Sequence, residues 1–261
     1  MKSLFNQKKR VLIGMIHLAP TLAYEGWPGL SKFVDKAKKD FYSLQKAGFD
    51  AALIENDGDH PCKVEGTADV VVPMTIVAKE LSKISSIPLG VEVLLNDPKA
   101  SLTIAKVTGL NFIRTDYFVD RMERKGYGEF EIDPSGIIDY RRKIAAKKVK
   151  IFADVQVKYA TMIKKKTVAE SVKQALKKGA DGIIVSGTKS GDEPIIKELN
   201  EAKLASGGKV PIIIGSGFSI KNAEKLFKYA DWVIVGSSIK EKGMVDIKKA
   251  KELVELVKSI K

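Results

Sequence analysis

Cysteine is almost absent from this sequence of 261 residues, and long apolar runs and linker-like stretches are absent altogether. The single cysteine, Cys62, excludes an internal disulfide and a cysteine metal cluster. No run approaches the roughly 18 apolar residues of a membrane-spanning helix, so we predict no membrane span. The basic residues 1–10 have neither an apolar core nor a cleavage site, which argues against a signal peptide and favours a cytoplasmic protein.

The net charge of +13 suggests an anionic partner, but its distribution favours another interpretation. Lysine supplies most of the charge and falls at outward positions of predicted helices. Arginine and aromatic residues are not interleaved, and no helix-turn-helix or zinc-finger spacing is present. We therefore predict a solvated, lysine-rich surface and no nucleic-acid partner.

A degenerate repeat organises the chain: a helix end, a tight turn, and a short buried strand that ends in polar residues. The unit recurs at residues 46–56, 107–116, 178–187 and 228–237. Such repetition is typical of alternating strands and helices in a parallel sheet. Filling the gaps gives eight strands, which begin near Val11, Ala51, Leu89, Phe112, Val149, Gly182, Pro211 and Trp232.

Eight such units predict an α/β fold, a single (β/α)₈ TIM barrel that spans residues 1–261 as one domain. A doubly wound open sheet is the alternative, but eight units in this length favour closure. The segment from Tyr117 to Pro134 is too polar for a strand, so we predict a lid or side loop there.

Two glycine-containing turns follow the predicted seventh and eighth strands. Glycine lets main-chain N–H groups approach phosphate oxygens, and a short helix after the eighth strand adds its positive N-terminus. The alternative is that these glycines only form turns. Two such turns at these barrel positions favour phosphate binding, and they resemble the phosphate-binding loops of the tryptophan synthase α subunit. The predicted phosphate-binding residues are Gly187, Gly215, Ser216, Gly217, Gly236 and Ser237.

Polar side chains at the other strand ends should converge on the same C-terminal mouth of the barrel. Alternation in the fifth strand predicts four side chains facing the barrel axis, namely Phe152, Asp154, Gln156 and Lys158. The predicted catalytic acids and bases are Glu55, Asp154 and Lys158, since buried carboxylates need a compensating role. The predicted substrate-binding residues are His17, Asn96 and Arg114.

Structural alternatives remain open for these residues. His17 fits a hydrogen-bonded core histidine, Arg114 a partner of a neighbouring carboxylate, and Asp154 an internal ion pair with Lys158. Asp57 and Asp59 fit a turn around Gly58. Glu92, within an apolar strand, is predicted to pair with an interior cation, and Cys62 is not expected to be a nucleophile.

No cofactor is predicted from the sequence, although a divalent metal is compatible with it. A site made by His17, Glu55 and Asp154 is conceivable, but no ligand spacing enforces it. We therefore assign no metal ligand.

Several of the same segments carry a resemblance to a known family. They lie at residues 13–20, 55–59, 88–91, 95–97, 151–155, 157–158, 215–217 and 234–238. Together they resemble the BtpA family, which includes SgcQ-like proteins, over essentially the whole chain. The resemblance implies a barrel related to the ribulose-phosphate-binding group. It links the family to photosystem I biogenesis and, in many members, to neighbouring sugar or nucleoside genes, without a settled reaction.

The sequence departs from the family pattern around the predicted mouth. The family has other residues where Asp57, Cys62, Glu92, Leu95 and Tyr159 stand here, and residues 115–120 differ most. Because these departures surround the mouth, a substrate known for the family could not be transferred directly to this chain.

The expected function is that of an enzyme acting on a phosphorylated sugar or nucleoside-like small molecule. Proton transfer, or cleavage of a carbon–oxygen or carbon–nitrogen bond, is the expected reaction type. The alternatives are a non-catalytic assembly or stability factor, as in photosystem I biogenesis, and a regulator that binds a phosphorylated ligand. A homo-oligomer is compatible with the sequence.

Overall fold

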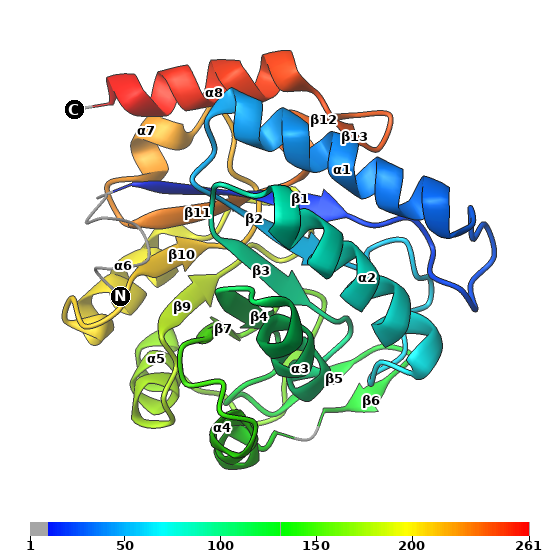
Figure 1. The fold of residues 1–261 in the computed structure, drawn as a ribbon. Helices are drawn as coiled ribbons and strands as arrows, with labels where there is room; N and C mark the ends of the chain where they lie inside the picture. The colour runs from blue at the N-terminus through cyan, green and yellow to red at the C-terminus, as the bar shows by residue number, and fades with distance from the viewer. Residues whose placement is uncertain (1–9, 131, 261) are drawn as a thin grey trace.

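Eight parallel strands form a closed barrel in the computed structural model, which describes residues 10–130 and 132–260. The barrel strands are β1 (Val11–His17), β2 (Ala51–Glu55), β3 (Leu89–Glu92), β4 (Phe112–Thr115), β7 (Lys150–Val155), β9 (Gly182–Val185), β10 (Ile212–Ile214) and β11 (Trp232–Val235). They pair in that order, and β11 pairs with β1 to close the ring (Figure 1). The predicted barrel is confirmed, and the open sheet is excluded.

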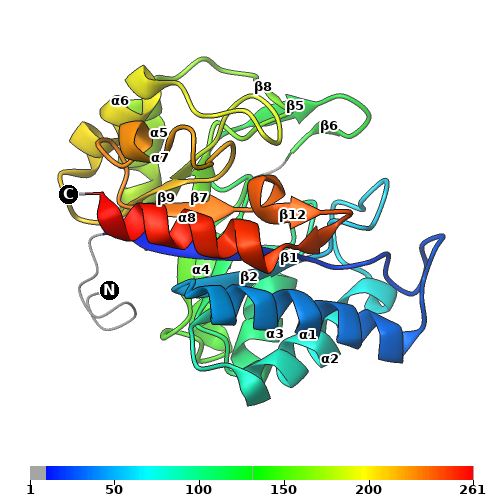
Figure 2. The ribbon, with the colours of Figure 1, turned by 90° about the horizontal axis from the view of Figure 1, so that it is seen from above.

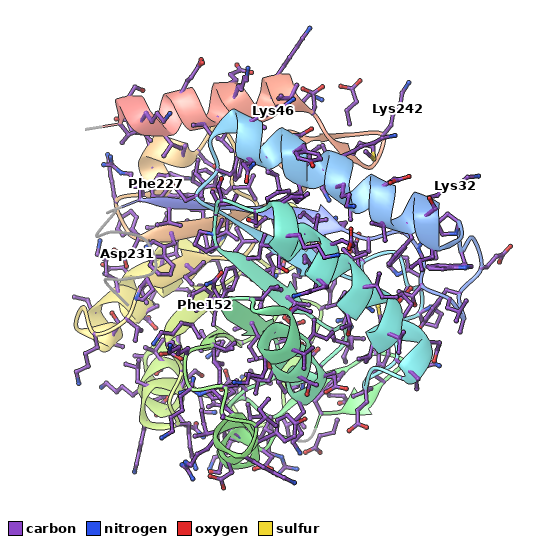
Figure 3. The ribbon with its side chains drawn as sticks, viewed as in Figure 1. Lys32, Lys46, Phe152, Phe227, Asp231 and Lys242 are labelled. Carbon is purple, nitrogen blue, oxygen red and sulfur yellow. The ribbon has the colours of Figure 1, made fainter. Side chains whose placement is uncertain are left out.

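Helices surround the barrel as an outer layer (Figures 1 and 2). They are α1 (Leu30–Ala47), α2 (Ala68–Ile84), α3 (Pro98–Thr108), α4 (Pro134–Lys143), α5 (Val168–Lys177), α6 (Ile196–Ser206), α7 (Ala223–Leu226), η1 (Ser237–Ile239) and α8 (Ile247–Ser259). Apolar stripes on these helices pack on the barrel, while lysines such as Lys32, Lys46 and Lys242 are exposed (Figure 3). This arrangement fits the predicted solvated surface.

The barrel interior is filled by side chains at alternate strand positions. A separate buried cluster inside the ring includes Ile13, Leu53, Phe112, Phe152 and Trp232. The Phe112 and Phe152 rings stack, with their centroids 4.9 Å apart. Because side chains alternate along a strand, the next inward position on each strand lies above this apolar layer, at the C-terminal mouth.

Residues 117–134 include strands, contrary to the loop predicted from their polarity. Strands β5 (Met122–Arg124) and β6 (Gly128–Glu129) join β8 (Thr161–Met162), which follows β7, in a three-stranded antiparallel sheet. Strand β5 forms because it pairs with β8, more than 30 residues away in the sequence. The polarity of residues 117–134 does not reveal such a distant partner. Both ribbon views place this sheet at the end where the barrel strands finish (Figures 1 and 2).

The predicted alternation in the fifth barrel strand is wrong for Gln156. The strand ends at Val155, and Gln156 has a φ of 50°, which breaks the alternation. Its side-chain amide donates to the Lys166 carbonyl and to the Ser171 hydroxyl of α5, on the helix side of the strand. Asp154 and Phe152 keep their inward orientation.

No helix among the described residues is long and apolar enough to cross a membrane, as the sequence predicts. The remaining strands, β12 (Lys240–Glu241) and β13 (Met244–Val245), form a small hairpin before α8. Most of the basic N-terminal segment, residues 1–9, lies outside the described residues.

The Phe112 ring fits inside the barrel because residue 90 is a glycine. This dependence gives a first testable prediction. A Cβ atom at Gly90 would lie 2.1 Å from the Phe112 ring, and that ring is fully buried. We expect Gly90→Ala to lower the free energy of unfolding by about 1–3 kcal/mol through overpacking, measured by urea denaturation. The control is Val107→Ala on α3, where the side chain is 61% exposed. Equal stabilities of the two variants would contradict this account.

Candidate functional site

A cavity of about 320 Å³ opens at the C-terminal ends of the barrel strands. Its walls come from β1 to β4 and β11, and from the loops that follow β2, β3, β4, β7, β9, β10 and β11. Nine sequence-predicted site residues line it, namely His17, Glu55, Arg114, Lys158, Gly215, Ser216, Gly217, Gly236 and Ser237. This is the mouth where ligands bind in TIM barrels.

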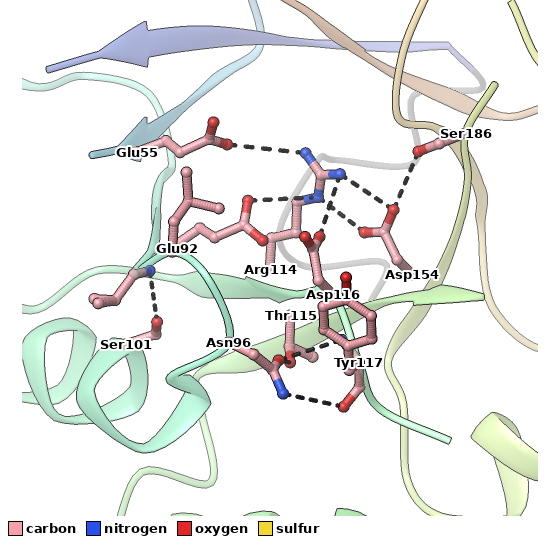
Figure 4. A network of polar contacts seen from close by, with 12 residues as sticks. Glu55, Glu92, Asn96, Ser101, Arg114, Thr115, Asp116, Tyr117, Asp154 and Ser186 are labelled. Atoms are coloured by element: carbon pink, nitrogen blue, oxygen red, sulfur yellow. Dashed lines mark hydrogen bonds and ion pairs between the residues drawn. The ribbon is translucent and has the colours of Figure 1, made fainter. Parts of the chain in front are cut away.

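A buried arginine lies at the base of this cavity, within an acidic cluster (Figure 4). Arg114 donates from Nε and Nη2 to both carboxylate oxygens of Asp154, at 2.8 and 3.1 Å. Three more carboxylates surround the guanidinium, those of Glu92 at 3.5 Å, Asp116 at 3.6 Å and Glu55 at 3.9 Å. The prediction that Glu92 pairs with an interior cation is therefore confirmed.

Burial changes the ionisation of this cluster. It raises the pKa of Glu92 well above the usual range, and neither carboxyl oxygen has a hydrogen-bond partner among the described residues. It also raises the pKa of Asp116 to about 6. Burial opposes the charge of Arg114, but the neighbouring carboxylates raise its pKa further still. The cluster thus combines a fixed cation with carboxyl groups that take up protons more readily than exposed ones.

Glu55 differs from Glu92, although the two stand at the same register on adjacent strands. Burial favours the neutral acid here too, but the positive charges of His17, Arg114 and Lys158 outweigh it and lower the pKa of Glu55. Two carboxyl groups whose pKa values are shifted in opposite directions therefore lie side by side. Pairs of this kind are typical of acid–base sites.

Three of the predicted residues lie outside the cavity lining. Asp154 is covered by Arg114 and by the hydroxyl of Ser186, which donates to it at 3.1 Å. The side chain of Asn96 bonds with Thr115 and with the main chain of Tyr117, so it shapes the end of β4 (Figure 4). Gly187 donates its N–H to the Ser216 hydroxyl. In this geometry Asp154 and Gly187 support Arg114 and Ser216 of the lining, whereas the partners of Asn96 lie outside it.

Close main-chain approach explains two of the glycines after β9 and β10. A Cβ atom at Gly187 or Gly217 would lie 2.2–2.3 Å from main-chain atoms of Asp192. At Gly236, by contrast, a Cβ atom would meet only the His17 ring and Met15, at 3.5 Å. The N–H groups of Ser216, Gly217 and Gly236 donate to no acceptor in the described part of the chain. Unsatisfied donors of this kind are suited to an anion.

His17 and the loop after β2 form the wall next to the loop after β11, since a Cβ atom at Gly236 would lie 3.5 Å from the His17 ring. His17 Nδ1 lies 3.3 Å from Asp57 Oδ2. Burial lowers the pKa of His17, against the raising effect of Glu55. Asp59 is different, because it accepts from the Thr21 N–H, the Thr21 hydroxyl and the Asn56 amide. Asp59 therefore stabilises the turn around Gly58 through its hydrogen bonds. Asp57 instead lines the cavity.

The small β5–β6–β8 sheet contributes the outer rim. Arg124 stacks over the rings of Tyr127 and Tyr159, at 5.5 and 5.2 Å from their centroids. The Tyr159 hydroxyl accepts the N–H of Ser190, in the loop after β9. These side chains line the cavity without filling it.

Cys62 is buried and Lys240 is half-buried close to the same wall. Burial and nearby carboxylates raise the pKa of the Cys62 thiol to about 12, which suits the predicted lack of nucleophilic reactivity. Burial lowers the pKa of Lys240 to about 8, and its Nζ has no hydrogen-bond partner among the described residues. Lys240 does not line the cavity.

Sequence reasoning did not assign roles to Asp116, Arg124 and Tyr159. Asp116 lies two residues after Arg114, so continued alternation carried a usable signal for it. Arg124 carried no such signal, because it reaches the cavity only through the pairing of β5 with β8.

Comparison of the sequence with known proteins identifies the family of this chain. The model of the BtpA family matches residues 8–259. The chain belongs to the BtpA family. An uncharacterised protein of Methanocaldococcus jannaschii is 35% identical, with 97% of each chain covered. The photosystem I biogenesis protein BtpA of Synechocystis is 32% identical, over 92% of this chain and 84% of that protein.

Solved structures show that this BtpA-family barrel shares its fold with well-known enzymes. The 3-hexulose-6-phosphate synthase of Salmonella typhimurium matches with a TM-score of 0.62 and 14% identity, over 96% of this chain and 100% of that one. The N-(5′-phosphoribosyl)anthranilate isomerase of Pyrococcus furiosus matches with a TM-score of 0.60 and 14% identity, over 96% and 100%. At these identities the likeness concerns the fold alone.

The raised pKa of Asp116 predicts a pH-dependent stability. The folded state holds this proton more tightly than the unfolded chain, where an aspartate has a pKa near 3.9. Its stabilising effect is therefore complete below about pH 4 and is lost as the pH rises through about 6. Asp116→Asn removes this loss. We expect the variant to gain about 2–3 kcal/mol relative to the parent between pH 4 and 7.

The measurement is urea unfolding of both proteins at unit pH steps. Asp139→Asn, an exposed position on α4, is the control for loss of an aspartate as such. Parallel stability profiles for Asp116→Asn and the parent would show that Asp116 is not a shifted group.

Proposed function

We propose that this BtpA-family protein binds a phosphorylated sugar or nucleoside-like small molecule in the barrel mouth and acts on it by acid–base catalysis. The observation that carries the proposal is the composition of one cavity. Its lining combines ionisable side chains with Ser216, Gly217 and Gly236, whose main-chain N–H groups donate to no acceptor among the described residues. A ligand that carries both a phosphate and other polar groups matches this lining.

Phosphate binding is assigned to the loops after β10 and β11. Gly217, Gly236 and Ser237 form the expected contact surface, with η1 beginning at Ser237. Ser216 shapes this surface, since its hydroxyl accepts from Gly187 and donates to the Asp192 carbonyl. The N–H groups of Gly187 and Gly215 are not available to a phosphate. Gly187 donates to the Ser216 hydroxyl, and Gly215 donates to the Val185 carbonyl. Structures of similar fold include proteins named for phosphorylated compounds.

Proton transfer is assigned to groups that reach the cavity. Glu55, as a carboxylate, is the candidate base, and protonated Asp116 or Glu92 is the candidate acid. Lys158 supplies a positive charge near Glu55 and Asp116, suited to an oxyanion on the substrate. Asp154 acts through Arg114, whose orientation it holds.

Binding without turnover is the competing function, as in a regulator or an assembly factor. A mouth filled by residues 117–134 would favour an assembly factor. Arg124 and Tyr127 of that segment instead line an open volume of about 320 Å³. Open volume beside ionisable groups favours a small-molecule enzyme over a factor that uses only the barrel exterior.

Substitution of Gly236 tests the phosphate site. Gly236→Asp adds a carboxylate where the phosphate is expected, and like charges repel. We expect it to abolish binding of sugar phosphates in calorimetry, with a native circular dichroism spectrum. Gly236→Ala is the matched control, because a Cβ atom there makes only contacts of 3.5 Å. Unchanged affinity in folded Gly236→Asp would rule out a phosphate at this loop.

Substitution of Lys158 tests the ionisable part of the lining. Lys158 is half-buried in the lining and has no ion-pair partner within 4 Å among the described residues. Lys158→Met keeps the aliphatic stem, so we expect a melting temperature within about 2 °C of the parent. Ligand affinity or turnover should fall at least tenfold. Lys165→Met, at an exposed position, should change neither quantity. Full activity of Lys158→Met would remove this residue from the site.

A further inference from the structure

Three ligand-type side chains meet at the β1–β2 wall of the cavity. His17 and Glu55 stand at the same register on paired strands, and Asp57 follows Glu55 by two residues. Asn56 points the other way and is bonded to Leu94 and Asp59. Alternation therefore brings Glu55 and Asp57 to the same side as His17. One ligand atom from each of the three side chains lies within 4.8 Å of those of the other two.

The Glu55 carboxylate lacks the close cationic and amide partners that normally accompany burial. The residue is 8% exposed, yet no amide, guanidinium or ammonium donor of the described residues lies within hydrogen-bond distance of it. Its nearest cation, Arg114, is 3.9 Å away and is committed to Asp154 at 2.8 Å. Asp59, four residues on, accepts three hydrogen bonds. A buried carboxylate that faces a cavity without such a partner indicates a missing cationic ligand.

We propose that His17, Glu55 and Asp57 bind one divalent transition-metal ion at this wall. One imidazole nitrogen with two carboxylate oxygens suits Mn²⁺ or Zn²⁺, whereas Mg²⁺ and Ca²⁺ favour sets made of oxygen alone. Three protein ligands on one side leave the remaining coordination positions facing the cavity. These positions take water or a ligand oxygen.

This assignment differs from the metal site that the sequence made conceivable. Asp154 is occupied by Arg114 and Ser186, and Asp57 takes its place beside His17 and Glu55. The His17 ring also lies 3.5 Å from the Cβ position of Gly236, so the ion sits next to the loop after β11. The inference goes beyond the proposed function, since a metal site here requires no phosphate.

Mn²⁺ alone is the probe, added to the full chain after removal of metals with a chelator. Free Mn²⁺ gives a strong paramagnetic resonance signal that is lost on binding, so a titration reports stoichiometry and affinity. We expect one site per chain. Asp57→Asn and His17→Gln should each weaken binding at least tenfold. His60→Gln is the matched control, because His60 is the second histidine of the chain, lines the same cavity and lies outside the cluster.

Absence of Mn²⁺ binding to the parent protein, and of Zn²⁺ binding in competition, would overturn the proposal. Parent-like affinity in Asp57→Asn would also overturn it, and this variant alters a side chain that is 48% exposed, so folding is preserved. Weakening by His60→Gln equal to that by His17→Gln would move the site elsewhere. Because the titration contains no phosphate, its outcome is independent of the test on Gly236.

Discussion

The positive charge of Arg114 allows a cluster of acidic side chains to be buried at the mouth of this barrel. Four carboxyl groups, from three neighbouring strands and the loop after β4, lie within 4 Å of its guanidinium. Without that cation, burial of so many acids would cost several kcal/mol each or force them to take up protons. The arginine thus allows several carboxyl groups to lie at the base of one cavity.

This cluster also separates the roles of similar residues. Asp154 receives the two short hydrogen bonds of Arg114, so it orients the cation and stays out of the cavity. Glu92 and Asp116 receive longer contacts and face the cavity as acids whose pKa values burial raises. The charges of neighbouring groups lower the pKa of Glu55 despite its burial. Burial and the charges of the neighbours together therefore set the pKa of each carboxyl group.

Strand periodicity made most of this arrangement predictable. The repeat placed the eight strands. Their positions at strand ends placed Glu55 and Arg114 at the mouth, and alternation placed Asp154 in the barrel interior, where they lie. One error has a local cause, because the positive φ that turns Gln156 away from the barrel axis is invisible in the sequence. The hydrogen bonds of Asn96 with Tyr117 and of Asp154 with Arg114 join residues distant in the sequence, so the sequence did not assign them. Spacing alone also gave no reason to choose Asp57 over Asp59.

The β5–β6–β8 sheet affects how the loops around the mouth can move. It joins the loop after β4 to the loop after β7, and Tyr159 extends the connection to the loop after β9 through Ser190. Three loops that are separate in sequence are thus tied into one rim. Movement of this rim has to take place as a unit, because it would break strand pairing and the stacking of Arg124 on two tyrosines. Such movement should accordingly be cooperative and fall on the microsecond-to-millisecond scale of collective motions, slower than the movement of one free loop.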